Sequence, residues 1–228
     1  MRDTPDAVML FAAGFGTRMR PLTDAMPKPL IKVAGRPLID HALDLARAAA
    51  PRRIVANLHY RAAQLKDHLK NTEVRLVCEE PLILDTGGGL RHALPTLGAD
   101  TVWTVNTDAI WQGPNPLTFA LEHWDPERMV ALLVCVPPSR AVQHSGAGDF
   151  TMGADGRLSW GPGVIYGGVQ IMKTEGLHSI RKEVFSLTEV WAAMAQDGKL
   201  FGATYPGSWC DVGHPSGIAA AEALLREG

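Results

Sequence analysis

The fold is decided by the stretch Leu10-Phe-Ala-Ala-Gly14-Phe-Gly16-Thr-Arg-Met-Arg-Pro-Leu-Thr23. The apolar run that leads into it, residues 7–13, is typical of a buried parallel strand, and this strand passes directly into a glycine-rich loop. Gly14 and Gly16 tolerate positive φ angles and have no Cβ atom, so backbone N–H groups can close on a phosphate there. The stretch therefore predicts a strand that is followed by an anion-binding loop.

Positive side chains accompany this loop. Arg18 contributes a planar fork of N–H donors, and Lys28, in Pro27-Lys28-Pro29-Leu30, contributes a compact charge. Two glycines alone are equally typical of a tight turn with solvated charges around it. A dinucleotide-binding unit is not indicated because the third glycine of its fingerprint is missing, and a P-loop is not indicated because no Gly-Lys-Ser/Thr follows. The complete string through Pro-Lys-Pro is far more specific for polyphosphate binding than the glycines are.

Apolar runs and amphipathic segments alternate along the chain. We expect strands at residues 7–13, 53–57, 74–78, 101–106, 129–136, 164–172 and 202–205. We expect helices at residues 37–50, 61–69, 86–94, 116–124, 187–196 and 215–226. Residues 137–168 instead carry Pro and Gly turns around short segments, which indicates an antiparallel hairpin inserted at an edge of the sheet. The pattern predicts an α/β fold, a single-domain, doubly wound, mostly parallel sheet with a hairpin insertion.

Composition restricts the partners and the compartment. The chain is 46% hydrophobic and 20% charged with a formal net charge of −2, which suits a soluble globular protein and gives no basic field for nucleic acid. No apolar stretch approaches the ~18 residues of a membrane span, and the N-terminus has no signal-peptide pattern. Cys78, Cys135 and Cys210 are widely separated, as is typical of reduced cytosolic thiols. We therefore expect a cytoplasmic protein that binds neither nucleic acid nor membrane.

The motif Ala12-Ala-Gly-x-Gly-Thr-Arg-Met-x-Pro-Leu-Thr23, followed by Pro-Lys-Pro-Leu30, resembles the signature of the sugar-1-phosphate nucleotidyltransferases of the glycosyltransferase-A-like type. These enzymes transfer a nucleoside monophosphate from an NTP to a sugar 1-phosphate and release pyrophosphate. Later motifs extend the resemblance over nearly the whole chain, and among the subfamilies it looks closest to N-acetylmuramate α-1-phosphate uridylyltransferase. The resemblance implies one Rossmann-like domain, in which residues 1–136 bind the nucleotide and residues 137–228 bind the sugar and close the fold, with no C-terminal β-helix domain.

A carboxylate follows the strand expected at residues 101–106. Ligands of open α/β sheets bind beyond the carboxyl ends of the strands, so Asp108 is placed to hold Mg²⁺ in the crevice, although aspartate here is also typical of a helix cap or a solvated site. The resemblance identifies Asp108 with the metal-binding aspartate of the family, with Thr107 in place of the usual glycine. It identifies Asp211, in Trp209-Cys-Asp-Val-Gly213, with the second ligand of the same ion.

Three consecutive glycines, Gly87-Gly88-Gly89, lie between an expected strand and an expected helix. They allow a flat base to approach, and the helix N-terminus offers free N–H donors, although the same composition is typical of a flexible turn. The resemblance places Asp149, in a segment that is also typical of a hairpin turn, against the sugar hydroxyls, with Gly168 beside it. Ser186 stands where relatives often carry a charged residue near the sugar phosphate.

The resemblance implies a role for each candidate residue. The catalytic candidates are Arg18, Lys28 and Asp108, and the ligands of Mg²⁺ are Asp108 and Asp211. The NTP is expected to contact Ala13, Gly14, Gly16, Thr17, Arg18, Lys28, Thr86, Gly87 and Asn106. The sugar is expected to contact Asp149 and Gly168.

The expected reaction is an in-line displacement that transfers UMP from UTP to N-acetylmuramic acid 1-phosphate. Mannose-1-phosphate guanylyltransferase and glucose-1-phosphate thymidylyltransferase are alternatives, because they share the fold and the motifs and differ in the base and the sugar. A non-catalytic, regulatory module that binds a nucleotide sugar is an alternative of another class. The joint presence of Arg18, Lys28, Asp108 and Asp211 argues against that module, because a sensor has no need of all four. We expect a monomer or a homodimer.

Overall fold

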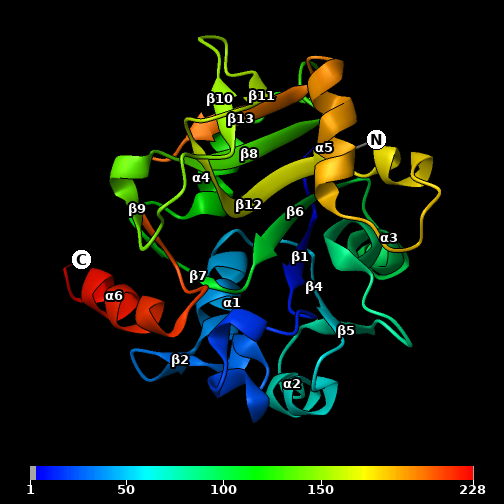
Figure 1. Ribbon diagram of the computed structural model, residues 1–228. Coiled ribbons are helices and arrows are strands. Elements are labelled where there is room, and N and C mark those ends of the chain that lie inside the picture. Colours follow the sequence, from blue (N-terminus) through cyan, green and yellow to red (C-terminus); the bar gives the residue numbers. More distant parts are fainter. Residues whose placement is uncertain (1–3, 228) are drawn as a thin grey trace.

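The computed structural model describes residues 4–227, which fold around a seven-stranded sheet (Figure 1). In spatial order the strands are β13 (Leu200–Thr204), β8 (Ala131–Val136), β12 (Ile165–Lys173), β6 (Thr101–Asn106), β1 (Ala7–Phe11), β4 (Arg53–Leu58) and β5 (Arg75–Cys78). Strands β6, β1, β4 and β5 form a parallel set, and β13 is parallel to β8. Strand β12 runs antiparallel to both of its neighbours. The predicted α/β class with a mostly parallel sheet is therefore confirmed.

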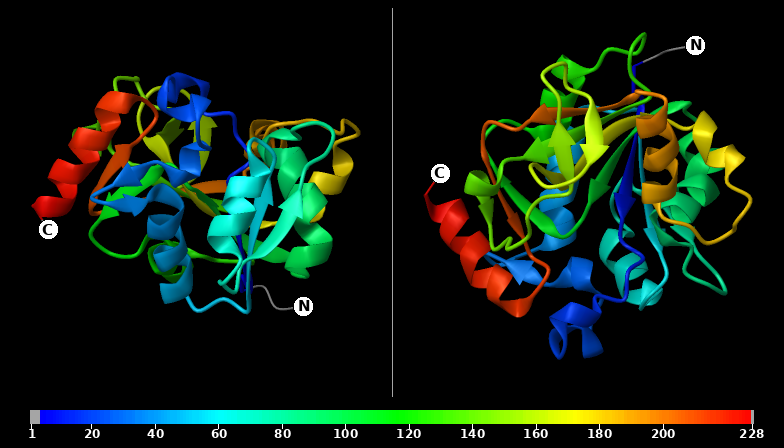
Figure 2. Two further views of the ribbon diagram at one scale, coloured as in Figure 1. Left: turned by 90° about the horizontal axis from the view of Figure 1, so that it is seen from below. Right: turned by 45° about the horizontal axis from the view of Figure 1, so that its top comes forward.

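Helices cover both faces of this sheet, because alternate residues of each buried strand point to opposite sides. Val8 and Leu10 of β1 belong to a buried cluster with residues of α1, α2 and α4, whereas Met9 between them belongs to a cluster with residues of α3 and α5. Helix α6 lies outside these layers, at the opposite side of the molecule from α3 and α5 (Figure 2). The helices are α1 (Leu38–Ala48), α2 (Ala62–Leu69), α3 (Asp85–Leu97), α4 (Pro116–His123), α5 (Leu187–Gln196) and α6 (Pro215–Arg226).

A second, three-stranded sheet joins early and late parts of the chain. Its strands are β7 (Ala109–Gln112), β14 (Ser208–Asp211) and β9 (Ala141–Val142). Strand β14 pairs with β7 in the antiparallel and with β9 in the parallel direction. These strands were not predicted, because they are short and lack the length of apolar run that marks the strands of the main sheet. Their pairing carries β14 to the residues that follow β6.

The expected hairpin insertion is confirmed. Strands β10 (Phe150–Met152) and β11 (Leu158–Trp160) pair in the antiparallel direction, and a bridge between Arg157 and Phe201 joins the hairpin to β13, the edge strand of the main sheet. A second small hairpin is formed by β2 (Lys32–Val33) and β3 (Arg36–Pro37). Short 3-10 helices occupy residues 17–19, 22–24, 28–30, 138–140 and 175–179.

Helix α3 begins at Asp85, one residue before its expected start, and extends to Leu97, beyond its expected end. The three glycines therefore lie inside its first turns and not between the strand and the helix. The helix continues through Pro95 and ends at Gly98, which has a φ of 57° and donates its N–H to the Leu94 carbonyl. Glycine at this position is an ordinary helix end, because it adopts the left-handed conformation without a Cβ penalty.

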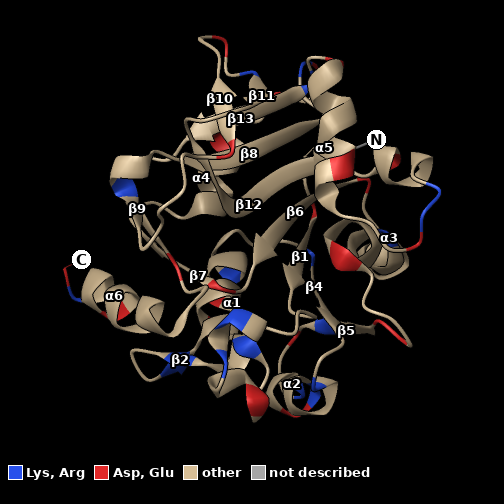
Figure 3. Ribbon diagram, viewed as in Figure 1, with Lys and Arg blue, Asp and Glu red and all other residues tan. Residues whose placement is uncertain are grey.

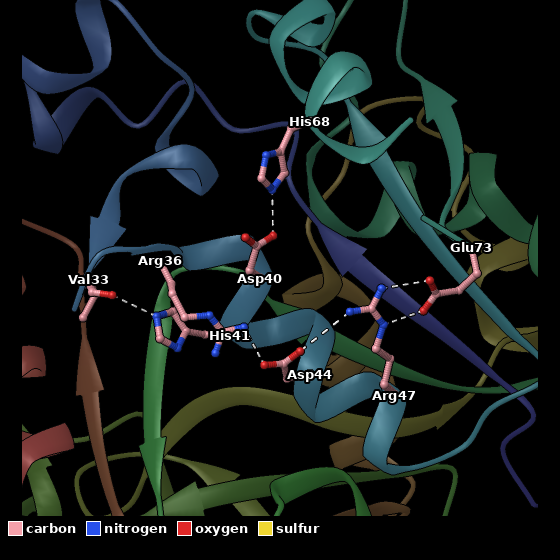
Figure 4. Close-up of polar contacts among 8 residues, drawn as sticks. All are labelled: Val33, Arg36, Asp40, His41, Asp44, Arg47, His68 and Glu73. Carbon is pink, nitrogen blue, oxygen red and sulfur yellow. Dashed lines mark hydrogen bonds and ion pairs between the residues drawn. The ribbon is translucent and has the colours of Figure 1, made fainter. Parts of the chain in front are cut away.

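Polar contacts at the surface connect α1 to the neighbouring elements (Figure 4). Arg47 donates two hydrogen bonds to the carboxylate of Glu73, at 2.7 Å and 2.9 Å, and this pair connects the end of α1 to the segment before β5. His68 of α2 lies 2.7 Å from the carboxylate of Asp40. The interactions hold α1 against α2 and β5, and none of these four residues lines the cavity described below.

Two expectations from composition can be compared with the structure. All three cysteines are free thiols, of which Cys135 and Cys210 are buried and Cys78 is half-buried. Among residues 4–227, every helix is too short or too polar to cross a membrane.

Candidate active site

A cavity of about 330 Å³ opens at the carboxyl ends of β1, β4 and β6. Its walls include residues 12–14 and 16–19 of the glycine-rich loop, the pair Lys28-Pro29, and residues 106–108 after β6. Crevices beyond the carboxyl ends of parallel strands are the usual ligand sites of open α/β sheets. Every residue predicted to contact the NTP lines this cavity except Gly87.

The two glycines of the loop have different surroundings. Gly16 has a left-handed φ of 62°, and a Cβ atom there would lie 2.8 Å from Cβ of Lys28. Such a contact is too short for a side chain, so glycine lets the loop pack directly on the lysine. Around Gly14 no heavy atom lies within 4 Å of the position of a Cβ atom. Gly14, which lines the cavity, therefore has open space where a side chain would lie.

Figure 3 shows Lys and Arg in blue and Asp and Glu in red along the ribbon, and residues of both signs line the cavity. Lys28 is only 8% exposed, and its Nζ atom lies 2.7 Å from Oδ2 of Asp108. Arg18 lines the same cavity and is exposed to solvent. A largely buried ammonium group that is paired with one carboxylate remains a strong electrostatic partner for an incoming phosphate, because little water screens it.

Asp211 is brought to Asp108 by the small sheet. The register of β14 on β7 pairs Asp211 with Ala109, and the N–H of Val212 donates to the Asp108 carbonyl at 2.9 Å. Burial raises the pKa of Asp211, and the negative charge of Asp108 raises it further, while Lys28 and Arg18 act in the opposite direction. The two aspartates, the lysine and the arginine thus share one electrostatic environment.

The donor set of this acidic pair suits a hard divalent cation. In the part of the chain that the structure describes, no group of three or more His, Cys, Asp or Glu residues is arranged to hold a metal ion. A pair of carboxylates beside a phosphate site is nevertheless sufficient for Mg²⁺, which commonly takes one or two carboxylates and completes its shell with water and phosphate oxygens. Asp108 and Asp211 therefore fit such an ion.

Thr107, at the position where the resemblance leads us to expect glycine, makes a hydrogen bond between two strands. Its hydroxyl donates to the Phe11 carbonyl at 2.7 Å, which ties the end of β6 to the end of β1. The preceding residue, Asn106, packs closely on Gly168, where φ is 91° and a Cβ atom would lie 2.9 Å from Cβ of the asparagine. Gly168 does not itself line the cavity but lies directly behind a residue that does.

The expectation for the three glycines is corrected. The N–H groups of Gly87 and Gly88 both donate to the Phe185 carbonyl, at 2.9 Å and 3.0 Å, so they are not free donors for a ligand. A Cβ atom on Gly87 would lie 2.4 Å from the Phe185 ring. Gly87 and Gly88 make room for the segment before α5, and the residues of this part of the chain that line the cavity are Asp85 and Thr86.

The residues predicted for the sugar lie outside this cavity. Asp149 accepts the N–H of Tyr166 at 2.9 Å through Oδ2, at the base of the hairpin. Ser186 is the N-cap of α5, and its hydroxyl accepts the N–H of Thr188 at 3.3 Å, which explains why serine suits this position. Sugar contacts of Asp149 and Gly168 remain predictions.

Comparison with known proteins identifies the family. Residues 8–223 match the model of the MobA-like NTP transferase domain. The chain belongs to the MobA-like NTP transferase family. It is therefore an enzyme, a nucleotidyltransferase, and the resemblance to the sugar-1-phosphate nucleotidyltransferases is confirmed.

Individual relatives of this nucleotidyltransferase cover its whole length. An N-acetylmuramate alpha-1-phosphate uridylyltransferase from Caulobacter vibrioides is 37% identical over 241 aligned positions that cover 100% of both chains. A protein of the same name from Neisseria meningitidis is 33% identical, over 95% of this chain and 96% of its own. The crystal structure of HddC from Yersinia pseudotuberculosis matches the fold with a TM-score of 0.76 at 20% identity, covering 96% of this chain and 99% of its own.

Asn57 and Glu79 are polar residues of the nucleotidyltransferase cavity that were missed from the sequence, and Asp85, the first residue of α3, is a third. Asn57 is the next-to-last residue of β4, and Glu79 directly follows β5. Glu79 is fully buried and accepts hydrogen bonds from Asn57 Nδ2 at 2.6 Å and from the N–H of Leu84 at 2.7 Å. Asn57 in turn accepts the N–H of Ala12 at 2.9 Å. The rule that selected Asp108, a polar residue at the carboxyl end of a strand, selects Asn57 and Glu79.

Proposed function

We propose that the enzyme transfers UMP from UTP to N-acetylmuramic acid α-1-phosphate and releases pyrophosphate. The observation that carries the proposal is the meeting of Asp108 and Asp211, from distant segments, beside the loop of Arg18 and Lys28. The names of the two full-length relatives support uracil as the base and N-acetylmuramate as the sugar.

The chemistry requires positioning and charge stabilisation more than acid–base catalysis. An oxygen of the acceptor phosphate attacks the α-phosphorus of UTP, a new P–O bond forms, and the bond between the α-phosphorus and the bridging oxygen breaks as pyrophosphate leaves. The attacking phosphate is already an anion, so no protein base has to deprotonate it. In this proposal Arg18 binds the β- and γ-phosphates, and Lys28 binds the α-phosphate and the incoming phosphate.

A divalent cation completes the proposed site. Asp108 and Asp211 would hold Mg²⁺, which when bound neutralises negative charge on the phosphate oxygens. Asp108 already binds a cation in the structure, the ammonium group of Lys28 at 2.7 Å. Asp108 lines the cavity, whereas Asp211 lies just behind its wall, with its carboxylate beside the lining residue Gly213.

The reaction is tested by measuring pyrophosphate release for four NTPs crossed with the 1-phosphates of N-acetylmuramic acid, glucosamine, mannose and glucose. We expect the highest kcat/KM with UTP and N-acetylmuramic acid 1-phosphate in the presence of Mg²⁺. A preference for GTP with mannose 1-phosphate, or for dTTP with glucose 1-phosphate, would replace the proposal with one of the alternative specificities.

The role of the acidic pair is tested by Asp108→Asn. The substitution keeps the shape of the side chain and removes its charge, so we expect kcat to fall by about a hundredfold or more while the fold is retained. Asp155→Asn, on the exposed hairpin, is the matched control and should leave kcat unchanged, because Asp155 pairs only with Arg157 and lines no cavity. Near-normal turnover of Asp108→Asn would exclude the metal assignment.

A further inference from the structure

Tyr60 contacts the glycine-rich loop at three points without lining the cavity. Its N–H donates to the Ala13 carbonyl at 3.2 Å, its ring centroid lies 5.6 Å from that of Phe15, and its hydroxyl donates to the Thr23 carbonyl at 2.8 Å. The loop lies beside α2, which Tyr60 precedes by two positions (Figure 1). The three contacts bracket the candidate residues Gly14, Gly16, Thr17 and Arg18.

The side chain of Thr23 in turn contacts the centre of the glycine-rich loop. Thr23 is 1% exposed, and its hydroxyl donates to the Gly16 carbonyl at 2.9 Å. The same carbonyl accepts the N–H of Met19 at 2.9 Å. Gly16 is the residue with the left-handed φ of 62°, so the peptide at the turn of the loop is oriented by a chain of hydrogen bonds from Tyr60 through Thr23.

The start of α2 directs the Tyr60 hydroxyl and supports the loop further. Nε of Arg61 donates to that hydroxyl at 3.1 Å, which leaves the phenolic proton for the Thr23 carbonyl. A second nitrogen of Arg61 donates to the Asp24 carbonyl, and the side-chain amide of Gln64 donates to the Ala25 carbonyl at 3.0 Å. The three consecutive carbonyls of residues 23–25 are thus held by Tyr60, by the N-cap Arg61 and by Gln64 of α2.

We propose that Tyr60 is a positioning residue for the NTP. Its hydroxyl holds the loop, before substrate arrives, in the conformation in which Gly14, Gly16 and Arg18 meet the triphosphate, and a preorganised loop loses less conformational entropy on binding. The inference rests on the proposed function, which assigns this loop to the NTP. None of the contacts of Tyr60 involves Asp149 or Gly168, so its effect is confined to the nucleotide.

The test is Tyr60→Phe, which removes one hydroxyl and keeps the ring against Phe15. We expect KM for UTP to rise about threefold to tenfold, the usual weight of one hydrogen bond, with KM for the sugar 1-phosphate unchanged. Tyr205→Phe is the matched control, because the buried Tyr205 hydroxyl also donates to a backbone carbonyl, that of Pro114, and lies outside the site. It should lower the melting temperature without changing either KM.

A second variant tests the chain of hydrogen bonds that leads from Tyr60 through Thr23 to Gly16. Thr23→Val removes the hydroxyl that donates to Gly16 and should raise KM for UTP in the same direction. The double variant Tyr60→Phe/Thr23→Val should raise it by less than the product of the single effects, because both hydroxyls act through one chain. If the two single effects on KM for UTP multiply in the double variant, the proposed chain of hydrogen bonds is overturned.

Other outcomes decide the role of Tyr60. An unchanged KM for UTP in Tyr60→Phe overturns the proposal, and so does an equal rise for both substrates or a similar rise in Tyr205→Phe. Calorimetric titration with UTP separates this inference from the proposed function. If the wild-type protein binds UTP but releases no pyrophosphate, the proposed function is overturned. The ratio of the dissociation constants for UTP of Tyr60→Phe and wild type then still decides the role of Tyr60.

Discussion

Single glycine residues of the site serve opposite purposes. A Cβ atom on Gly14 would meet no protein atom within 4 Å, so packing does not require glycine there, and in the proposed function the open space is left for the triphosphate. A side chain on Gly87 would meet the Phe185 ring at 2.4 Å, so the absence of a Cβ atom there matters to folding. The two residues look alike in the sequence, because each lies in a glycine-rich segment beside an expected strand.

Alanine at these two positions should separate binding from stability. Gly14→Ala should leave the melting temperature unchanged and raise KM for UTP by about tenfold or more, because it adds a methyl group to the cavity wall that the proposed function assigns to the triphosphate. Gly87→Ala should destabilise the fold by about 1–3 kcal/mol, because Phe185 has to move. Thermal unfolding and steady-state kinetics of both variants check this, and a stable Gly87→Ala protein would contradict the packing described here.

At the scale of the elements, the segment before α5 contacts α3 through other residues besides the glycines. Arg91 donates to the carbonyls of Ile180 and Lys182, and its guanidinium group lies 4.6 Å from the centre of the Phe185 ring. The N–H of Leu187, the first residue of α5, donates to the hydroxyl of Thr86 at 3.0 Å. A residue of the cavity wall thus directly holds the helix that follows this segment.

The ion pair between α1 and the segment before β5 gives a pH dependence of known sign. Hydrogen bonds from Arg47 lower the pKa of Glu73 from 4.5 to about 2. The folded-state pKa is depressed, so the stabilisation is complete above about pH 4.5 and is lost as the pH falls towards 2. Because Glu73 is half exposed, solvent screening limits the effect to less than about 1 kcal/mol.

Urea unfolding of Glu73→Gln measures this contribution. The variant should be less stable than wild type near neutral pH, and the difference should shrink in acid as the wild-type carboxylate takes up its proton. Glu122→Gln, a change at an exposed glutamate of α4, is the control and should show no such trend. A difference that stays constant from neutral to acid pH would contradict the ion pair as its source.

The sequence predicts long apolar elements well, because burial on both faces demands an unbroken apolar run. The strand around Val8 and the strand that ends at Asn106 are examples, and their carboxyl ends correctly located Asp108 and the glycine-rich loop. Strands β7 and β14 were not predicted, because a segment of four residues such as Ala109–Gln112 is too short to show a hydrophobic periodicity. The environment of Gly87 could not be foreseen, because its neighbour Phe185 is far away in the chain.

At the scale of the whole molecule, two thiols report whether separate buried clusters remain closed, Cys135 for the cluster beneath α3 and α5 and Cys210 for the cluster beneath α6. Cys135 and Cys210 are buried, and burial raises the pKa of both, that of Cys210 to about 11. Cys78 is half-buried. Reactive thiolate is therefore disfavoured at the two buried positions.

Labelling with a thiol-specific reagent near neutral pH should modify Cys78 first. We expect one fast-reacting thiol in the native chain and three in denaturant, and Cys78→Ser should remove the fast phase. Rapid modification of a second thiol in the native protein would show that the buried cluster around Cys135 or the one around Cys210 opens readily.

The small sheet of β7, β14 and β9 has a consequence for how the molecule is made. Asp108 is synthesised near the middle of the chain, whereas Asp211 arrives with one of the last strands. A nascent polypeptide can assemble much of the parallel sheet while half of the acidic pair is still inside the ribosome. Translation order therefore delays the second carboxylate until 103 residues have been added after Asp108, since 211 − 108 = 103.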